Sequence, residues 1–372
     1  MTNVLFAGGG TGGHLYPALA LADALVLEQP DVRPHFVGAL RGVEARVLPA
    51  ENRPHTLLPF EPLRRSRVWE NWKLLPSMWN SMRGLAKLFD ELNPKLVVGT
   101  GGYASAPACL YAWRRGVPVA IQEQNSHAGL TQRTVSRWAR QVHLGFPEAK
   151  KDMKPGKRTE VFALGNPIRP PDPTIDRAEA RKMFGLKHDS TVVLVTGGSQ
   201  GSRALNEAVL GGIIAHPHFR ALAPSLELLW ATGPTQYESI EKQLPEAARE
   251  WVRLHGYISN MPEAMAATDI AVSRAGAMAT AELLAWGIPA ILVPLPTAAA
   301  DHQTHNAKAL EAAGAAVMLR EADAKPERLW SELTSLVKDA DKLARMRAAA
   351  TQRAEPNAAQ KIAKHLSQFL TE

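Results

Sequence analysis

The sequence predicts two doubly wound α/β domains that face one another across a central cleft. Two observations lead to this fold class. Short apolar runs alternate with segments of helical periodicity in both halves of the chain, and a glycine-rich loop follows the first apolar run of each half. Continuous apolar strands separated by helices are typical of a parallel sheet that is covered on both faces.

The strands follow one another at regular intervals. The first half has apolar runs at residues 4–7, 35–37, 96–98 and 117–121, with a helical pattern at 15–27. The second half has apolar runs at residues 191–196, 226–231, 270–273, 290–293 and 315–319. Between the halves, residues 165–173 contain four prolines, which is typical of a linker. We therefore expect an N-terminal domain over 1–165, a C-terminal domain over 166–350, and a final helix within 351–372 that could pack back on the first domain.

The composition excludes several protein classes. The chain has 372 residues, and 45% of them are hydrophobic, which is enough for two buried cores. Cys109 is the only cysteine, which excludes an intrachain disulfide and a multi-cysteine metal site. No apolar run reaches the roughly 18–20 residues of a membrane span. Residues 1–6 are expected to form a strand rather than a signal peptide, so we expect a cytoplasmic protein.

The positive charge is concentrated in the first half of the chain. The net charge is +7, and residues 1–165 carry 21 lysines and arginines against 13 acidic residues, whereas the remainder carries 22 against 23. A basic half is either a solvated surface or the partner of nucleic acid, anionic lipid or a phosphorylated substrate. Because the usual nucleic-acid-binding signatures do not occur, we expect no nucleic acid partner.

A stretch rich in tryptophan and arginine, residues 63–88, bears on which anionic partner the basic half would bind. Its large apolar residues recur every three or four positions, which predicts one face of a helix. That face could pack on its own domain, or it could lie in a lipid interface with the basic side chains on anionic headgroups. Three tryptophans beside arginines add weight to the second interpretation. The predicted membrane face consists of Trp69, Trp72, Leu75, Trp79, Met82 and Leu85.

Glycine-rich loops carry the chemistry of the first half. Residues 8–14, GGGTGGH, follow the first strand and open a helix, where unpaired N–H groups favour a phosphate. A dinucleotide-binding fold would place an acidic residue after the second strand, but that strand ends in Gly38. His14 closes the loop and is a candidate to accept a proton. A similar loop follows the strand at 96–98.

The second half has a corresponding set of loops. Ser199 lies in the loop 197–201 and can donate its hydroxyl group to a phosphate. Glu282 lies in the second turn of the helix that follows the strand at 270–273, where an acid suits the hydroxyl groups of a ribose or the helix dipole. A polar cluster at 301–307 indicates ligand contact, but its histidines do not form a recognised metal-ligand set. We expect no metal site.

Seven motifs, taken in order, resemble one enzyme family. They are GGGTGGH at 8–14, GTGGYASAP at 99–107, EQN at 123–125, GNPIR at 165–169, GGSQGS at 197–202, SRAGA at 273–277 and DHQTHNA at 301–307. This order is similar to that of the N-acetylglucosaminyltransferases of peptidoglycan synthesis that act on lipid I, the MurG family of glycosyltransferase family 28. The resemblance runs from about residue 3 to about residue 318.

The resemblance implies the GT-B fold and an inverting transfer of N-acetylglucosamine from UDP-N-acetylglucosamine to the 4-hydroxyl of the N-acetylmuramyl sugar of lipid I, which gives lipid II. The donor would bind the C-terminal domain, and lipid I would bind the N-terminal domain. Ile258 would contact the uracil through its backbone, Glu282 the ribose, and Ser199 the diphosphate. The remaining implied donor contacts are Thr11, Gly12, Gly13, Asn125, Arg169, Ala277, Met278, Ala279, Thr280, Ala281 and Gln303.

The resemblance also implies an acceptor side and a cellular setting. Tyr103 would contact the acceptor, and His14 would be the catalytic base, with Glu123 as the second candidate. No cofactor is expected. The implied partners are lipid I, the anionic inner face of the cell membrane and other cell-wall synthesis proteins, which fits a peripheral location on the cytoplasmic side and a role in cell-wall biogenesis, cell shape and division. The chain departs from the family pattern at Gln122, where many members have His, and at Gln132, where they have Asn.

Three alternatives remain open from the residues. One is a GT-B transferase with a different lipid or small-molecule acceptor. Another is a UDP-N-acetylglucosamine 2-epimerase, which needs several acidic residues around the sugar, and this chain offers little beyond Glu123 and Asp301. The third is a non-catalytic nucleotide-binding protein at the membrane. The product formed would distinguish the first two, and binding without turnover would identify the third.

Overall fold

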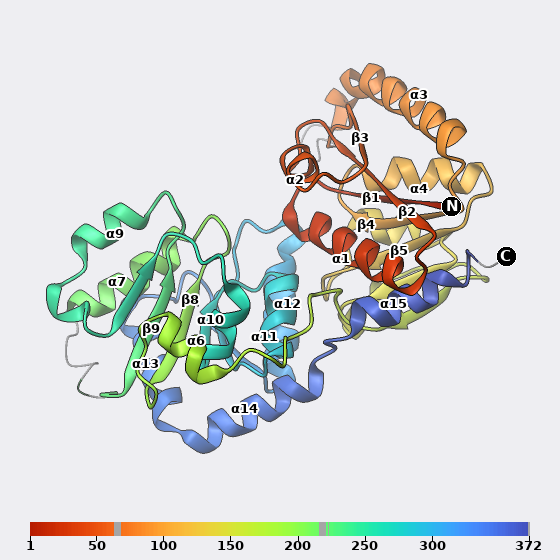
Figure 1. Cartoon of the computed structure of the whole chain (residues 1–372). Coiled ribbons are helices and arrows are strands. Elements are labelled where there is room, and N and C mark those ends of the chain that lie inside the picture. Colours follow the sequence, from red (N-terminus) through yellow and green to blue (C-terminus); the bar gives the residue numbers. More distant parts are fainter. Residues whose placement is uncertain (63–67, 216–220, 222, 371–372) are drawn as a thin grey trace. The chain divides into compact units, whose positions relative to one another are not determined.

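The computed structural model describes residues 1–62, 68–215, 221 and 223–370. The chain divides into two compact units (Figure 1). Unit 1 comprises Met1–Arg169 together with the segment that begins at Pro356, and unit 2 comprises Pro170–Glu355. Each unit contains one sheet whose strands are all parallel, so the predicted class of two doubly wound, Rossmann-like α/β domains is confirmed.

Unit 1 is built on a seven-stranded sheet with the order β3-β2-β1-β4-β5-β6-β7. Its strands are β1 (Thr2–Gly8), β2 (Val32–Ala39), β3 (His55–Leu58), β4 (Leu96–Gly101), β5 (Val119–Glu123), β6 (Gln141–Leu144) and β7 (Glu160–Ala163). Its helices are α1 (Gly12–Glu28), α2 (Glu44–Ala50), η1 (Val68–Leu74), α3 (Leu75–Leu92), α4 (Ser105–Arg114), α5 (Leu130–Val135), η2 (Pro147–Asp152) and α15 (Ala358–Ser367).

Alternation along the strands gives this sheet two buried faces. Successive side chains of a strand point to opposite faces. In β1, Val4 and Phe6 belong to a core shared with α1, α2 and α15, whereas Leu5 and Ala7 belong to a core shared with α3, α4 and α5. Figure 1 shows α15 beside α1. The end of the chain therefore completes the hydrophobic core of the unit in which the chain began.

Unit 2 repeats the plan with six strands in the order β10-β9-β8-β11-β12-β13. Its strands are β8 (Thr191–Thr196), β9 (Leu226–Ala231), β10 (Val252–His255), β11 (Ile270–Ser273), β12 (Ala290–Leu292) and β13 (Ala316–Met318). Its helices are α6 (Arg177–Met183), α7 (Arg203–Ala215), α9 (Tyr237–Gln243), η3 (Glu246–Ala248), α10 (Met261–Ala267), α11 (Ala277–Ala285), η4 (Ala299–Asp301), α12 (His302–Ala312), α13 (Pro326–Lys338) and α14 (Ala340–Arg353).

The strand orders locate a switch point in each sheet. From β1 the chain winds outward to β3, returns to β4 on the other side, and continues to β7. From β8 it winds outward to β10, returns to β11, and continues to β13. Ligands of such sheets bind outside the carboxyl ends of the strands at the point where the winding reverses. The expected sites therefore lie after β1 and β4 in unit 1, and after β8 and β11 in unit 2.

The six residues of the predicted membrane face are exposed only in part. Trp69, Trp72, Leu75 and Trp79 have exposed fractions of 73, 66, 60 and 66%, whereas Leu85 is fully buried and Met82 packs against the same core. Spacings of three residues keep one face in the 3₁₀ helix η1, but in α3, with 3.6 residues per turn, Leu85 lies about 120° around the helix axis from Trp79. Met82 and Leu85 therefore face the core, whereas the earlier residues are exposed.

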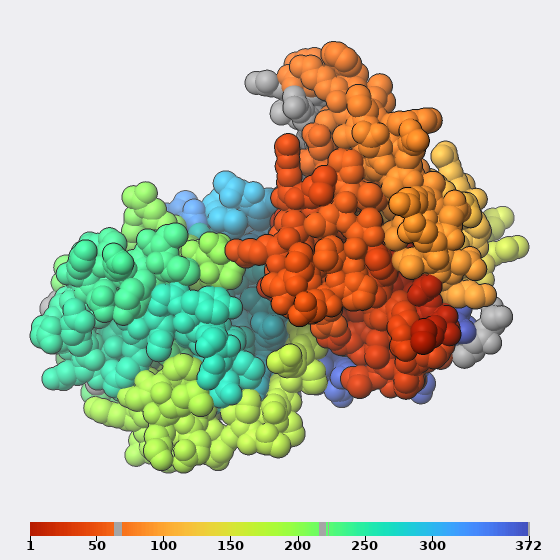
Figure 2. All heavy atoms as spheres, turned by 45° about the horizontal axis from the view of Figure 1, so that its top comes forward, coloured from red at the N-terminus to blue at the C-terminus, as the bar shows by residue number. Residues whose placement is uncertain are grey.

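One further residue joins the exposed part of this segment. Met78, which the pattern omitted, is 47% exposed on the same stretch of η1 and α3. We call Trp69, Trp72, Leu75, Met78 and Trp79 the tryptophan face. Its segment is drawn in orange in Figure 2. Arg64, Arg65 and Arg67, which the sequence places beside it, lie outside the described residues.

Across the described ranges, none of the helices is both long enough and apolar enough to cross a membrane.

A buried histidine is expected to make unit 1 sensitive to acid. His143 on β6 is fully buried, and its ring lies against Phe162 and against His365 of α15. Burial, with a smaller contribution from His365, lowers the pKa of His143 to about 3. Between pH 6.5 and 3 the unfolded chain therefore binds more protons than the folded chain, and the free energy of unfolding falls as the pH decreases through this range.

The test compares unfolding at two pH values. Lowering the pH from 7 to 5 should cost about 2 kcal/mol through this histidine, seen as a lower urea midpoint of unit 1. His143→Phe keeps an aromatic ring in the stack but cannot titrate, so its midpoint should change less with pH. His188→Gln, at an exposed histidine, is the control. Equal pH dependence in His143→Phe and the unmodified chain would refute the assignment.

Candidate functional site

A buried carboxylate shapes the first glycine loop. Glu44, at the start of α2, is fully buried, and its oxygens accept hydrogen bonds from the backbone N–H of Gly10 at 3.1 and 2.8 Å and of Ala39 at 2.8 Å. A Cβ atom on Gly9, Gly38 or Gly42 would overlap this carboxylate, so these glycines leave room for it. Glu44 therefore fixes the loop that carries Thr11, Gly12 and Gly13.

The loop after β4 closes over the same glycines. Gly102 has a φ of +79°, and a Cβ atom there would lie 2.1 Å from the carbonyl oxygen of Gly9, so only glycine fits. Tyr103 follows and packs on Gly10, where burial and the nearby charge of Glu44 raise the pKa of its phenol. The structure thus brings Tyr103 and the first glycine loop together.

His14 lies where the loops after β1, β4 and β5 meet. Its Nδ1 is 3.1 Å from the carbonyl oxygen of Thr100 and 3.2 Å from Oε1 of Gln124, and its backbone carbonyl accepts a hydrogen bond from the Thr100 hydroxyl at 2.8 Å. The ring is partly exposed. Its position at the carboxyl edge of the sheet fits a group that meets a ligand there.

Glu123 has a different environment from His14. It is buried at the end of β5, and burial raises the pKa of its carboxyl group, although hydrogen bonds from its own loop oppose this effect. One oxygen accepts from the backbone and side-chain amide of Asn125 at 2.9 and 3.2 Å, and the other accepts from the backbone N–H of Gly129 at 2.8 Å. The carboxylate therefore holds the loop that presents Asn125.

Four buried amide side chains connect these loops. Gln124 donates to the carbonyl oxygen of Thr100 at 2.8 Å and to Oε1 of Gln122 at 2.5 Å. Gln122 donates to Oδ1 of Asn166 at 3.0 Å, and Asn166 donates to the carbonyl oxygen of Gln124 at 2.9 Å. Gln132 donates to the carbonyl oxygens of Gln122 and Gly99 at 2.5 and 3.2 Å. The two positions that depart from the family pattern are therefore direct neighbours.

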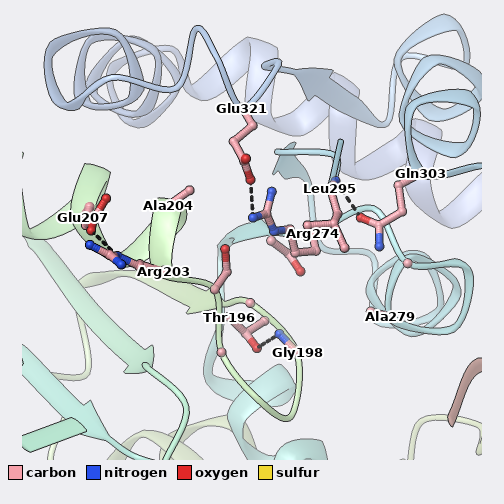
Figure 3. Close-up of a pocket in the computed structure, with 15 residues that line it drawn as sticks. Thr196, Gly198, Arg203, Ala204, Glu207, Arg274, Ala279, Leu295, Gln303 and Glu321 are labelled. Carbon is pink, nitrogen blue, oxygen red and sulfur yellow. Dashed lines mark hydrogen bonds and ion pairs between the residues drawn. The ribbon is translucent and has the colours of Figure 1, made fainter. Parts of the chain in front are cut away.

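Unit 2 has a pocket of about 600 Å³ at the corresponding edge of its sheet (Figure 3). Its wall includes the glycine loop between β8 and α7, the loop before α11, and side chains that follow β12 and β13. Gly201, in the first loop, has a φ of +75°, and a Cβ atom there would lie 2.0 Å from the carbonyl oxygen of Thr232. The loop therefore packs tightly against the turn after β9.

Two polar side chains hold the pocket together. The guanidinium group of Arg274 donates to the carbonyl oxygens of Val293 and Pro294 at 3.1 and 3.2 Å and forms an ion pair with Glu321. Oε1 of Gln303 accepts from the backbone N–H of Ala275 and Leu295 at 3.2 and 3.0 Å. Figure 3 shows the ion pair between Arg274 and Glu321 and the hydrogen bond between Gln303 and Leu295. The charged side chains of the wall are paired, Arg274 with Glu321 and Arg203 with Glu207.

The start of α11 offers backbone donors to this pocket. Gly276 precedes the helix and makes no side-chain cap, and both Gly276 and Ala279 line the pocket. The Thr280 hydroxyl donates to the carbonyl oxygens of Gly276 and Ala277 at 3.0 and 3.1 Å. An anion next to uncapped N–H groups is stabilised by their partial positive charge.

Several predicted donor residues lie outside the lining of this pocket. Burial raises the pKa of Glu282, one turn further along α11, to about 7. The Ile258 side chain is buried in the core, so its backbone is the part that can meet a ligand. Ser199 lies exposed at the tip of the glycine loop. The other predicted donor residues outside the lining are Thr11, Gly12, Gly13, Asn125, Arg169, Ala277, Met278, Thr280 and Ala281.

Sequence reasoning missed several residues that build these sites. Arg274 lay inside a recognised motif but received no role, and Arg203 lay just after another. Glu321 and Glu44 had no local signal, because each acts through a partner that is distant in sequence. Within the part of the chain that the structure describes, no three His, Cys, Asp or Glu side chains are arranged to hold a metal ion.

Comparisons with known proteins cover almost the whole chain. The N-terminal domain of glycosyltransferase family 28 matches residues 4–144, and the C-terminal domain of the same family matches residues 192–365. A Salinibacter ruber protein is 42% identical over 97% of this chain and 95% of its own length, and one from Chlorobaculum tepidum is 39% identical over 98% of each. Both are named UDP-N-acetylglucosamine–N-acetylmuramyl-(pentapeptide) pyrophosphoryl-undecaprenol N-acetylglucosamine transferase.

Solved structures support the same fold. The crystal structure of Acinetobacter baumannii MurG has a TM-score of 0.76 and 28% identity, and it covers 99% of this chain and 100% of its own. A UDP-GlcNAc 2-epimerase from Neisseria meningitidis has a TM-score of 0.66 and 15% identity, with 99 and 100% coverage. The second likeness shows the shared fold alone.

Glu44 is expected to be critical for the glycine loop. Glu44→Ala would leave the buried N–H groups of Gly10 and Ala39 without their acceptor and would open a cavity, so the free energy of unfolding of unit 1 should fall by roughly 2–4 kcal/mol. Glu51→Ala, which removes a half-exposed ion pair with Arg53, should cost less than about 1 kcal/mol. Urea unfolding of both variants measures the difference, and similar losses would contradict this role.

Proposed function

The chain belongs to glycosyltransferase family 28, and from that premise we propose that it transfers N-acetylglucosamine from UDP-N-acetylglucosamine to the 4-hydroxyl of the N-acetylmuramyl sugar of lipid I. The observation that carries the proposal is the 42% identity, over 97% of the chain, to a curated protein named for this reaction. The pocket in unit 2 and the surroundings of His14 in unit 1 supply the chemistry that such a transfer needs.

The reaction is an inverting displacement at the sugar's anomeric carbon. The acceptor oxygen forms a bond to C1 of N-acetylglucosamine while the bond from C1 to the diphosphate oxygen breaks, and the electron pair leaves with UDP. The proton of the acceptor hydroxyl passes to a base on the protein. The transition state resembles an oxocarbenium ion, as in glycoside hydrolysis. The protein must therefore hold the leaving diphosphate and provide the base.

We assign the diphosphate to the pocket in unit 2. Backbone N–H groups of the loop 197–202 and of the start of α11 would face the phosphate oxygens, and Arg274, paired with Glu321, would hold the wall beside them. Such preorganised donors stabilise charge as it develops on the leaving group. Glu282 would accept hydrogen bonds from the ribose, and the backbone of Ile258 would contact the uracil. Gln303, Arg169 and Ser199 would complete the donor site.

We assign the base to His14 rather than to Glu123. Both oxygens of Glu123 accept hydrogen bonds from its own loop, and the side chain is buried. His14 is partly exposed beside the glycine loop, and an imidazole is suited to accept a proton near neutral pH. Glu123 would then position Asn125, and Tyr103 would contact the acceptor.

The tryptophan face would hold the enzyme on the membrane that contains its lipid substrate. Exposed tryptophans enter the headgroup boundary favourably, and exposed basic side chains nearby, Lys73, Arg83 and Lys87, would meet anionic lipid. We propose a peripheral location on the cytoplasmic side of the cell membrane. UDP-sugars are water-soluble and the lipid carrier is not. An enzyme that binds the membrane surface through the tryptophan face would have access to both substrates.

The rival activities are distinguished by product. An epimerase shares the fold and the donor, but it would release a free N-acetylmannosamine nucleotide without an acceptor. A transferase for another acceptor would bind the same donor but leave lipid I unchanged. The acidic side chains among the lining residues of the unit 2 pocket, Glu207 and Glu321, are paired with Arg203 and Arg274. An epimerase would need further acidic groups at the sugar.

The first test is a radiolabelled transfer assay. Purified protein is mixed with labelled UDP-N-acetylglucosamine and a short-chain lipid I analogue, and label in the lipid product is counted. His14→Ala should lower kcat by roughly 10²–10⁴-fold, which is the range of general base catalysis, with the donor KM little changed. Transfer by both proteins at similar rates would move the base elsewhere. Donor binding without transfer by the unmodified protein would refute the proposed acceptor.

The second test concerns the membrane. The double variant Trp72→Ala/Trp79→Ala should bind vesicles of phosphatidylglycerol and phosphatidylcholine at least tenfold more weakly, because each aromatic side chain contributes about 1.5–3 kcal/mol on burial. Leu27→Ala, at an exposed apolar residue on α1, is the control. Cosedimentation with the vesicles measures the binding, and repeating it at increasing salt separates the apolar contribution from the electrostatic one. Undiminished binding of the double variant would exclude this face as the contact.

A further inference from the structure

The buried amides of unit 1 have orientations that determine one another. The starting point is the backbone carbonyl of Gln124, which can only accept. Asn166 must therefore turn its Nδ2 toward it, at 2.9 Å, and its Oδ1 toward Gln122. Gln122 must then present Nε2 to Asn166, at 3.0 Å, and Oε1 to Gln124. Each orientation follows from a donor meeting an acceptor.

The same reasoning fixes the side chain of Gln124. Its Nε2 lies 2.5 Å from Oε1 of Gln122, 2.8 Å from the carbonyl oxygen of Thr100 and 3.1 Å from the carbonyl oxygen of Gln122. A reversed amide would place oxygen against three acceptors in a buried position, where unpaired polar groups cost about 1–3 kcal/mol. Oε1 of Gln124 must therefore point the other way, and it lies 3.2 Å from Nδ1 of His14.

The orientation of the Gln124 amide determines which nitrogen of the His14 ring carries the proton. Both groups next to Nδ1 of His14, the carbonyl oxygen of Thr100 and Oε1 of Gln124, are acceptors. A neutral imidazole carries one proton, and placing it on Nδ1 gives both acceptors a donor, whereas a lone pair on Nδ1 would face two acceptors. The lone pair that can accept a proton is then on Nε2.

We propose that Gln124 is a positioning residue that keeps the neutral ring of His14 protonated on Nδ1, so that Nε2 is the atom that receives the proton of the acceptor hydroxyl. Gln122 and Asn166 act through Gln124 by fixing its amide. The last step rests on the proposed role of His14 as the base, whereas the position of the proton does not. Gln124 is buried, and its Oε1 faces Nδ1 of His14, so it is argued to act through His14.

Nuclear magnetic resonance of the unliganded protein tests the position of the proton directly. In protein labelled with ¹⁵N-histidine, the ring nitrogens that carry a proton and those that carry a lone pair resonate far apart, and His14→Gln identifies the signals of His14. At a pH where the ring is neutral, we expect Nδ1 to carry the proton. A spectrum in which Nε2 carries it would overturn the proposal.

Two variants separate positioning from general stability. Gln124→Met fills similar space but offers no acceptor, so the Nδ1–H form should be less populated and the ring should become protonated at a lower pH. In Gln124→Glu the oxygen that replaces Nε2 faces three acceptors, so the carboxyl group should keep a proton there, while its other oxygen still accepts from Nδ1 and the Nδ1–H form should persist. An unchanged tautomer and titration of His14 in Gln124→Met would contradict the proposal.

The control removes a buried amide from the same network without touching His14. Gln132 donates to the carbonyl oxygens of Gln122 and Gly99, and it is as buried as Gln124. Gln132→Met should lose stability in a similar way, yet the ring of His14 should keep the proton on Nδ1. If Gln132→Met moved the proton as far as Gln124→Met does, the effect would be general loosening, and the specific role of Gln124 would be refuted.

Kinetics then connects the position of the proton to the reaction. Gln124→Met should lower kcat about tenfold, at the low end of what outer partners of a functional histidine contribute, and should leave the KM for UDP-N-acetylglucosamine unchanged. The acidic limb of its pH profile should move to lower pH. If the nuclear magnetic resonance result holds but His14→Ala retains full activity, the proposed base is wrong while the proton assignment stands. A raised donor KM with unchanged kcat would refute positioning.

Discussion

The carbonyl oxygen of Thr100 is the acceptor on which the site in unit 1 depends. It takes hydrogen bonds from Nδ1 of His14 and from Nε2 of Gln124, while the Thr100 hydroxyl donates to the backbone of His14. These bonds join the segments that follow β1, β4 and β5. The parallel sheet brings the three strand ends to one edge, but it does not order the loops beyond them. The buried hydrogen bonds do, because each would be costly to leave unmade.

In unit 2, different side chains order the loops that follow the strands. Gln303 accepts from the backbone after β11 and after β12, and Arg274 reaches the carbonyl oxygens after β12 and the Glu321 carboxylate after β13. The side chains that shape the pocket are thus satisfied within the protein. The glycine loop between β8 and α7 and the loop before α11 lie against this wall and line the same pocket.

The sequence predicted what depends on local pattern and missed what depends on distant partners. Apolar runs and glycines located β1, β4, β8 and β11 with their loops, because a buried parallel strand is continuously apolar. The edge strands β3, β7 and β10 were not predicted, since half-buried strands lack that signature. The buried strand β6 was not predicted either, because Gln141 and His143 interrupt its apolar run. Glu44 and Glu321 escaped because their partners are defined only by the fold. The spacing at 69–85 misled us because it approximates a helical repeat without matching 3.6 residues.

Gln122 shows how a departure from a family pattern can keep its function. An imidazole at this position, which the resemblance led us to expect, would offer one donor and one acceptor while neutral. The Gln122 amide offers the same pair, a donor to Asn166 and an acceptor for Gln124. An imidazole would lose its acceptor on protonation, and Gln124 would then face a donor. The amide cannot titrate, so the orientation passed to His14 is the same at every pH at which the protein is folded. Gln132 donates to the backbone carbonyl oxygen of Gln122 rather than to its side chain, so it supports the strand without setting the orientation of the amide.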